Sequence, residues 1–316
     1  MQKEIGGFIE LEIPKKNFWH SGGVYLNSAR NALRLAIRLY HIQKIHLPFY
    51  TCPVIWQAVK AENIEIVPYE IDENFLPKKT FLKNDCIFYI DYFGVCESQS
   101  RTLAKDYPFL FLDCAMSFYA PFLTCAQFYS PRKFFGVADG GILLSDKKNH
   151  FKFKRDFSFN RFSHLIKRIE GGSNFAYNDF NHNDDQLLNA PILTMSRLTK
   201  KMLGGIDYQN IQTKRLENFN FFHQYLKKYN YLNLQKQNYA PMYYPFWNEK
   251  TPLIKKEFLK NKIYCPQPWR DLEDLMGSQP CLTEREFYKN LLPLIIDQRY
   301  NQKDLQKMLN IIQGFI

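Results

Sequence analysis

The sequence lacks the patterns that mark membrane, secreted and zinc-binding proteins. It has no apolar run of about 18 residues, so no membrane-spanning helix is expected. The N-terminal MQKEIGGFIELEIPKK has no apolar stretch after a basic start, which argues against a signal peptide. The seven cysteines are scattered without a CxxC pair, so neither a zinc ribbon nor a disulfide framework is predicted. We interpret them as reduced core residues of a cytoplasmic protein.

The composition is that of a folded protein with a basic surface. Of the 316 residues, 46% are hydrophobic and 16% aromatic, which is enough for one large domain or two modest ones. No internal repeat or low-complexity linker interrupts the chain. Lys and Arg number 42 against 31 Asp and Glu, a formal net charge of +11. This charge is compatible with nucleic acid, anionic lipid or a phosphorylated small molecule as partner, and it does not define the fold.

The first 115 residues alternate between helical and strand patterns. SARNALRLAIRLYHI predicts a helix with Ser28 as its N-cap, and VIWQAVKAE and SQSRTLAKDYP predict two more. The strand patterns are KIHLPFYTCP, IEIVPYEID, CIFYIDYFG and FLFLD, followed by LTCAQFYSP and GGILLSD. This order predicts an α/β fold, a mostly parallel sheet with helices on both faces. Ligands bind such sheets at the carboxyl ends of the strands, where Ser28 and Asp113 are expected.

The pattern changes near residue 205. A long amphipathic helix follows in IDYQNIQTKRLENFNFFHQYLKKY, and NQKDLQKMLNIIQGF predicts a closing helix. Between them, PMYYPFWN, KIYCPQPW and NLLPLIID read as short strands. We therefore predict a large domain over 1–208 and a small C-terminal α+β domain over 209–316.

Three features in order along the chain suggest one cofactor. Ser28, Ala29 and Arg30 open a helix, whose free N–H groups can bind an anion. Asp113 ends a buried strand, and Lys133 lies in YSPRKFFGVADGG between two strands. A phosphate cradle, an isolated carboxylate and a lysine amine match the phosphate, the pyridine nitrogen and the aldehyde of pyridoxal 5′-phosphate.

The same segments resemble a known family. IGGFIELEI with YLNSARNALRLAI, FLDCAMSF, YSPRKFFGVADGG and LPLIIDQRYNQKDLQKM are similar, in this order, to segments of the DegT-type aminotransferases. These belong to the fold type I pyridoxal-phosphate enzymes, and many act on nucleotide-linked keto sugars. The resemblance runs from about residue 5 to 313. It is more specific for the fold than for the substrate.

The resemblance implies roles for individual residues. Lys133 would hold the cofactor aldehyde covalently and move the proton, and Asp113 would pair with the pyridine nitrogen. The implied cofactor-binding set also includes Ser28, Ala29, Arg30, Tyr50, Met116 and Ser130. Within it, Tyr50 would lie near the ring face, and Met116 stands where the family has Gln or His. Two further departures are Ala29 for the usual glycine and Phe128 for the usual serine.

The activity implied is amino transfer from an amino acid such as glutamate to a keto acceptor. The leading acceptor is a nucleotide-linked keto sugar for surface polysaccharide biosynthesis, with the enzyme a homodimer. A small-molecule substrate is thus expected rather than nucleic acid. One alternative is other pyridoxal-phosphate chemistry on a small amino compound. The other is a non-catalytic scaffold of the same fold that binds an anionic partner.

Two polar segments have alternative interpretations. Residues 147–168 interleave basic and aromatic residues, which fits a nucleic-acid or membrane surface. The interpretation we prefer is a helix with buried phenylalanines and lysine stems along its surface, at a subunit contact. The run NHNDD at 181–185 lacks a second histidine at ligand spacing, so we predict a polar loop rather than a metal site.

Overall fold

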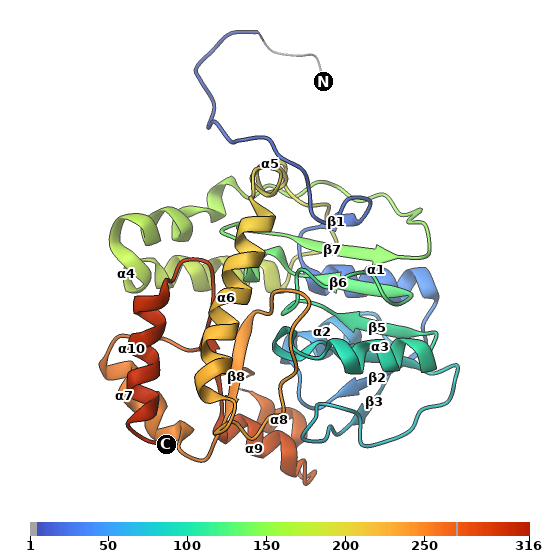
Figure 1. Ribbon diagram of the computed structural model, residues 1–316. Helices are drawn as coiled ribbons and strands as arrows, with labels where there is room; N and C mark the ends of the chain where they lie inside the picture. Colours follow the sequence, from blue (N-terminus) through green and yellow to red (C-terminus); the bar gives the residue numbers. More distant parts are fainter. Residues whose placement is uncertain (1–4, 270) are drawn as a thin grey trace.

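A seven-stranded sheet forms the centre of the computed structural model, which describes residues 5–269 and 271–316 (Figure 1). The strand order is β1-β7-β6-β5-β4-β2-β3. The strands are β1 Val24–Leu26, β2 Lys44–Pro48, β3 Glu65–Tyr69, β4 Cys86–Ile90, β5 Leu110–Asp113, β6 Ala126–Tyr129 and β7 Gly141–Ser145. Strands β3, β2, β4, β5 and β6 pair in parallel, whereas β7 is antiparallel to both of its neighbours. The predicted mostly parallel α/β sheet is confirmed.

The predicted helices of the first half are present. They are α1 Ala29–Tyr40, α2 Pro53–Lys60 and α3 Glu97–Asp106. Ser28 caps α1 as expected, because its Oγ accepts a hydrogen bond from the Asn31 N–H at 3.2 Å. The buried face of α1 packs against β6 and β7, next to the strand connection that carries Lys133.

The C-terminal part forms a second, smaller sheet with its own helices. Strands β8 Tyr243–Trp247 and β9 Leu291–Ile295 pair antiparallel. The helices are α6 Tyr208–Leu226, α7 Thr251–Lys260, α8 Leu272–Met276, α9 Leu282–Asn290 and α10 Gln302–Gln313. Helices α6 and α10 lie side by side in Figure 1 and are in contact. They bury a separate apolar cluster that includes Phe219, Tyr244 and Leu309.

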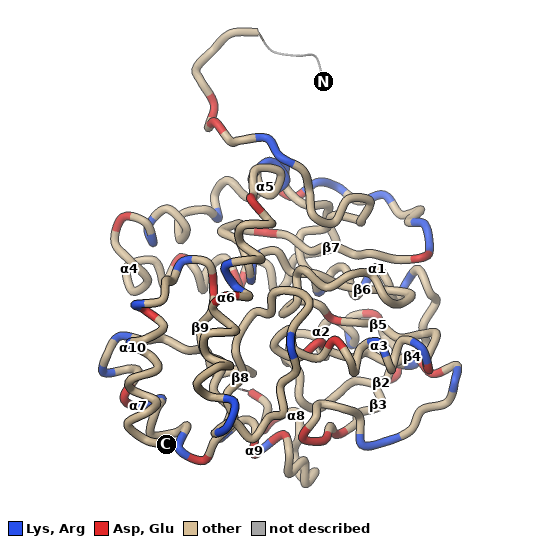
Figure 2. The backbone as a smooth tube through the Cα atoms, viewed as in Figure 1, with Lys and Arg blue, Asp and Glu red and all other residues tan. Residues whose placement is uncertain are grey.

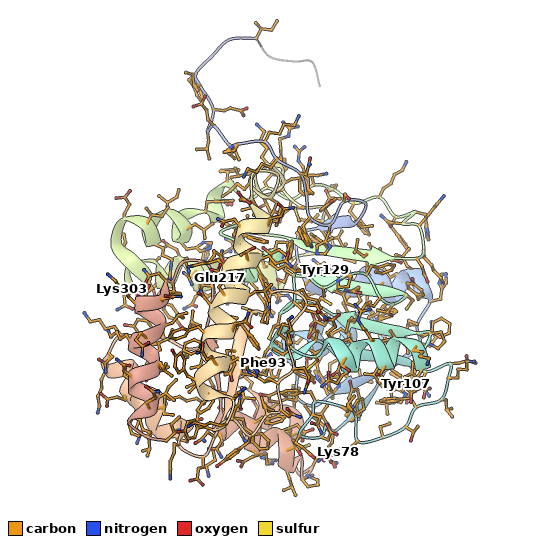
Figure 3. All side chains as sticks on the ribbon, in the orientation of Figure 1. Lys78, Phe93, Tyr107, Tyr129, Glu217 and Lys303 are labelled. Carbon is orange, nitrogen blue, oxygen red and sulfur yellow. The ribbon has the colours of Figure 1, made fainter. Side chains whose placement is uncertain are left out.

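The two sheets meet in a tight junction next to the end of β4. The amide of Met242 donates to the carbonyls of both Phe93, at 2.9 Å, and Met116, at 3.0 Å. Phe93, labelled in Figure 3, and Gly94 have φ values of 58° and 84°. A Cβ on Gly94 would lie 2.4 Å from the Met116 oxygen, so only glycine fits this close approach.

The division at residue 208 stays a prediction. It coincides with the start of α6 at Tyr208. However, Leu232, Tyr239 and Phe287 from beyond the division belong to the same apolar cluster as the main sheet. Part of the C-terminal segment therefore helps to build the larger core.

The structure differs from two of the sequence predictions for the middle of the chain. The run at 181–185 lies in a helix, α4 Ser163–Leu188, rather than in a loop. Conversely, residues 147–162 form no long helix and include only a short turn, η3 Phe159–Arg161. Phe157 and Phe159 are 63% and 74% exposed, so they are not the buried side chains we predicted.

One predicted strand is missing, and one strand was not predicted. Residues 263–269 of KIYCPQPW form no strand, since Pro266 and Pro268 supply no amide hydrogen to a ladder. Strand β1 is only three residues long and pairs at the sheet edge, which leaves it too short for a periodic signal. Within the ranges described above, no helix combines the length and the apolar character that crossing a bilayer requires.

Charged residues are spread over loops and helices in Figure 2, whereas the strands of the main sheet are largely uncharged. Asp113 is one of the few charged strand residues, and it ends β5, all of whose residues are buried. A buried charged group costs free energy unless it is paired or hydrogen-bonded. The carboxyl end of β5 is therefore a candidate position for a functional site.

Candidate active site

Lys133 is positioned by a short turn between β6 and β7. The turn is the 3-10 segment η2 Pro131–Lys133, in which the Lys133 N–H donates to the Ser130 carbonyl at 3.1 Å. Pro131 favours this start because its ring restricts φ. The next residue, Phe134, accepts a hydrogen bond at its carbonyl from the Gln298 side chain at 2.9 Å. The backbone is thus anchored on both sides of Lys133, while its side chain is exposed.

The same connection meets the start of α1. Ser28 forms a parallel bridge with Gly140, and the Gly140 N–H donates to the Asn27 carbonyl at 2.8 Å. A Cβ on Gly141 would lie 2.1 Å from the Ser28 carbonyl carbon, so this contact requires glycine. Gly140 and Gly141, at the end of YSPRKFFGVADGG, therefore bring the lysine turn against the N-terminus of α1.

Asp113 and Lys133 lie close together at the carboxyl end of the parallel strands. The Asp113 Oδ1 accepts a hydrogen bond from the Ala115 N–H at 2.8 Å, and the residue is 8% exposed. Burial raises the pKa of the Asp113 carboxyl, and the Lys133 ammonium acts against this shift from nearby. The structure thus places the two residues that the sequence singled out within electrostatic reach of each other.

Positive charge collects at the N-terminus of α1. Arg30 is half-buried in the first turn and forms no ion pair with a residue that the structure describes. Its pKa is lowered mainly by burial and then by the charge of Arg132, which itself pairs with Asp184 on α4. Two guanidinium groups and a helix N-terminus at one place favour an anion.

Tyr50 is a core residue near the end of β2. Its side chain is 1% exposed and packs in the core, edge-on to Trp269 with ring centroids 4.4 Å apart. Cys52, two residues further on, is half-buried at the start of α2, and Lys133 and Arg30 both favour the charged form of its thiol. Burial raises the pKa of the Cys52 thiol, and these two cations oppose the rise. We therefore add Cys52 to the candidate site residues, and the role of Tyr50 near the ring face stays a prediction.

Sequence reasoning missed Cys52 although a local signal was present. The residue is the N-cap of α2 and precedes Pro53, directly after the segment that leaves β2. A residue between the carboxyl end of a parallel strand and the start of the next helix lies at the usual ligand edge.

The remaining predicted residues lie around the same edge. Ser130 is half-buried and directly precedes the lysine turn, and Met116 is 6% exposed in the turn after β5. Phe128, by contrast, is 1% exposed and stacks on Phe88 in the core of the sheet. A phenylalanine at this position, where the resembled family has serine, therefore fills the core of the sheet.

Comparison with known proteins gives a clear result for the fold. No protein-family model matches the chain, and no curated protein matches it in sequence. Solved structures do match. A DegT/DnrJ/EryC1/StrS aminotransferase from Brucella abortus superposes with a TM-score of 0.62, at 12% identity, over 93% of this chain and 85% of that one. The chain has the fold of the DegT-type aminotransferases.

Two more structures with this fold were solved with cofactor. The PLP form of Spr1654 from Streptococcus pneumoniae, named as a sugar aminotransferase, matches with a TM-score of 0.64 at 13% identity, over 93% of this chain and 88% of that one. NtdA from Bacillus subtilis with bound PMP gives 0.63 at 11% identity, over 92% and 73%. The DegT-type fold, expected from four short segments of sequence, is thereby confirmed.

Proposed function

We propose that the protein is a pyridoxal-phosphate-dependent aminotransferase. The observation that carries the proposal is the position of Asp113 at the end of β5 and of Lys133 in the turn after β6, the neighbouring parallel strand. The start of α1, capped by Ser28, lies against the same turn. A buried carboxyl, a nearby exposed amine and a helix N-terminus are what the cofactor's three polar groups need. The residues present therefore fit this cofactor.

Each residue has a defined task in this proposal. When bound, pyridoxal phosphate supplies an aldehyde for the amino group and a ring that accepts electrons. Lys133 would hold the aldehyde carbon and would carry the proton, since its side chain is exposed on a fixed turn. Asp113 would pair with the protonated ring nitrogen, because a buried carboxylate is stabilised by a partner of opposite charge.

The phosphate would be held at the start of α1. The backbone N–H groups of Ser28, Ala29 and Arg30 lie in the first turn, where the helix dipole favours an anion. The Ser130 hydroxyl would add a donor from the lysine turn. The Arg30 guanidinium, which lacks an ion pair with any described residue, would supply opposite charge.

We further propose that the acceptor is a nucleotide-linked keto sugar and the donor an amino acid such as glutamate. The likeness to a structure named as a sugar aminotransferase supports the acceptor class. The cations Arg30 and Arg132 beside the site suit an anionic substrate. A role in surface polysaccharide biosynthesis and a cytoplasmic location belong to the same proposal.

A homodimer is also part of the proposal. Helix α4 exposes several large apolar side chains, namely Ile166, Ile169, Phe175, Tyr177 and Phe180. The N-terminal segment runs away from the body in Figure 1, with Ile5 and Phe8 at 96% and 98% exposure. Apolar surface of this extent supports contact with a second copy of the chain.

The test is chemical labelling of the lysine. The protein is mixed with pyridoxal phosphate, reduced with borohydride and digested, and the phosphopyridoxyl group is expected on Lys133. Lys133→Ala should lose both the label and amino transfer, while Lys200→Ala, at another exposed lysine, should keep both. A label on a different lysine would show that the site is wrongly placed. Absorbance changes with a panel of amino acids then identify the donor.

A further inference from the structure

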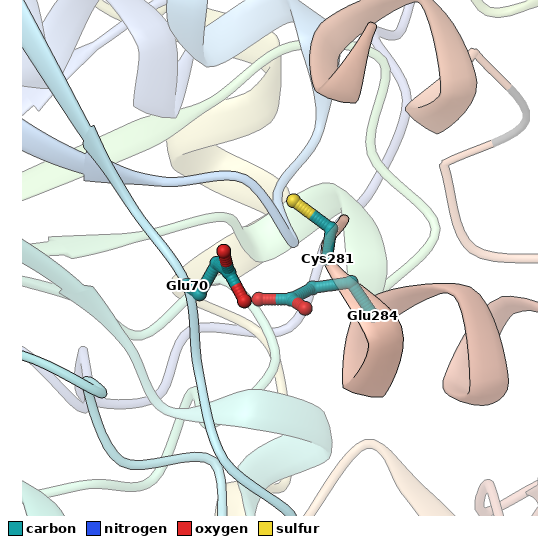
Figure 4. A group of neighbouring side chains, drawn as sticks. All are labelled: Glu70, Cys281 and Glu284. Atoms are coloured by element: carbon teal, nitrogen blue, oxygen red, sulfur yellow. The ribbon is translucent and has the colours of Figure 1, made fainter. Parts of the chain in front are cut away.

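A second cluster of reactive side chains lies away from the candidate active site. It consists of Glu70, directly after β3, together with Cys281 and Glu284 at the start of α9 (Figure 4). One ligand atom from each residue lies within 4.8 Å of the other two. The cluster therefore joins the edge of the main sheet to a helix of the C-terminal part.

Glu284 is the unusual member of the cluster. The residue is 0% exposed, and its Oε1 accepts a hydrogen bond from the Ile71 N–H at 2.6 Å. Its Oε2 is buried and has no hydrogen-bond partner among the described residues. In Figure 4 the carboxyl groups of Glu284 and Glu70 point toward one another. A buried carboxyl oxygen without a partner is costly, which calls for a bound group at this carboxyl.

The neighbouring cations do not provide a partner for the Glu284 Oε2 atom. The Lys78 ammonium lies 3.8 Å from the Glu70 carboxylate and donates to the Thr283 hydroxyl at 2.9 Å. Arg285 pairs with Glu273 and donates to backbone carbonyls. Two carboxyl groups and a thiol thus share one nearby lysine.

We infer that Glu70, Cys281 and Glu284 form a binding site for a borderline-soft divalent cation, best matched by Zn²⁺. A thiolate ligand selects against Mg²⁺ and Ca²⁺, which prefer oxygen ligands alone. Zinc accepts one sulfur and two carboxylate oxygens, and water can take the fourth position from the side where Glu70 is partly exposed. Binding displaces the Cys281 thiol proton and any proton on Glu284 to solvent.

The Ile71 amide completes the arrangement. By donating to Glu284 Oε1, it fixes the orientation of this carboxyl group, which in Figure 4 points toward Glu70. Hydrogen bonds of this kind position metal-binding carboxylates in general. The bound cation would fasten the segment after β3 to α9, and this role does not depend on the proposed aminotransferase activity.

Cobalt provides a direct spectroscopic test on the full chain. After chelator treatment under reducing conditions, the protein is titrated with Co²⁺. We expect one equivalent to give a thiolate-to-cobalt charge-transfer band in the near ultraviolet, together with visible bands of tetrahedral cobalt. Stoichiometric Zn²⁺ should abolish both. Wild-type protein that shows no such band would overturn the inference.

Substitutions in the three residues test which side chains bind the cation. Cys281→Ser should remove the charge-transfer band, and Glu284→Gln should weaken cobalt binding at least about tenfold, as loss of a group at a metal site does. Cys265→Ser, at a half-buried cysteine outside the cluster, should leave the titration unchanged. Glu70→Gln, at a partly exposed position, provides the test if a buried variant fails to fold. A band that persists in Cys281→Ser, or unchanged affinity in both glutamine variants, contradicts the site.

The rival explanation is a protonated Glu284 that donates a hydrogen bond to Glu70. In that case glutamine would replace the acid well, and Glu284→Gln would melt at or above the wild-type temperature with or without Zn²⁺. The cation site predicts instead that Zn²⁺ raises the melting temperature of wild type and not that of Glu284→Gln. Equal responses of the two proteins to Zn²⁺ would overturn the inference.

Discussion

Replacing Asp113 with asparagine should make the cofactor-free protein more stable and the enzyme much less active. The wild-type carboxyl is 8% exposed, and burial raises its pKa. Asparagine has nearly the same shape and keeps an oxygen that can accept from the Ala115 N–H. The substitution therefore removes a desolvated charge and leaves the turn intact.

The sign of the pH dependence follows from the raised pKa. The folded protein holds the Asp113 proton more tightly than the unfolded chain, whose aspartates titrate near about 3.9. Wild-type stability therefore falls as the pH rises from about 4 through the raised folded-state pKa of Asp113, and Asp113→Asn lacks this fall. We expect a gain of about 0.5–2 kcal/mol in the free energy of unfolding at pH 7, typical for neutralising a functional site. The gain should vanish toward pH 4.

Activity should change in the opposite direction. Without a charged partner for the ring nitrogen, amino transfer should slow by about 10²–10³-fold, or roughly 2.7–4 kcal/mol, the effect of losing one strong electrostatic group. Thermal melts of cofactor-free protein at pH 4 and 7 and single-turnover absorbance with an amino donor measure the two effects.

Asp139→Asn is the matched control for stability. The Asp139 carboxylate accepts from the Ser196 N–H at 2.8 Å and from the Ser196 hydroxyl at 2.7 Å, so this substitution should destabilise the protein. An Asp113→Asn protein that melts below wild type at pH 7 and transfers amino groups at the wild-type rate would refute the reasoning.

Two further predictions concern cofactor affinity and a buried acid. Ser130→Ala should weaken pyridoxal phosphate binding by about 1–2 kcal/mol, and excess cofactor should restore its activity. Ser28→Ala should have the same effect. Unchanged cofactor affinity in both variants would exclude phosphate binding at α1. Burial raises the pKa of Asp91 to about 6, and the Tyr239 hydroxyl donates to it and favours the charged form. Tyr239→Phe should therefore cost about 1–3 kcal/mol of stability at pH 8 and less at pH 5, where the neutral acid needs the donor less. Urea unfolding at both pH values checks this, and equal losses would contradict it.

Local interactions made part of the site predictable. The Ser28 cap and the apolar face of α1 depend on neighbours within one or two turns, so the sequence pattern located both. The run FLFLD likewise indicated a buried strand that ends at Asp113, and the structure has that strand at Leu110–Asp113. Because parallel strands present their carboxyl ends at one edge, the approach of Lys133 to Asp113 followed from the order of elements.

Only tertiary packing decided which side chain after β2 is fully buried. The alternation of a strand stops at Pro48, so period-two reasoning could not separate Tyr50 from Cys52. Trp269 and Phe287 form the aromatic pocket for Tyr50, and they come from the far end of the chain. Their packing holds Tyr50 in the core, whereas Cys52 is only half-buried.

Long-range contacts also determined the arrangement of the second cluster, which no local sequence pattern contains. The amide of Ile71 and the carboxyl of Glu284 are 213 positions apart, yet their hydrogen bond orients the cluster with Glu70 and Cys281. Helix propensity, capping and strand alternation act over a few residues, so the sequence by itself determined the elements and the edge where Asp113 and Lys133 lie. Burial of side chains from distant segments against one another determined which groups meet, because that depends on the whole core.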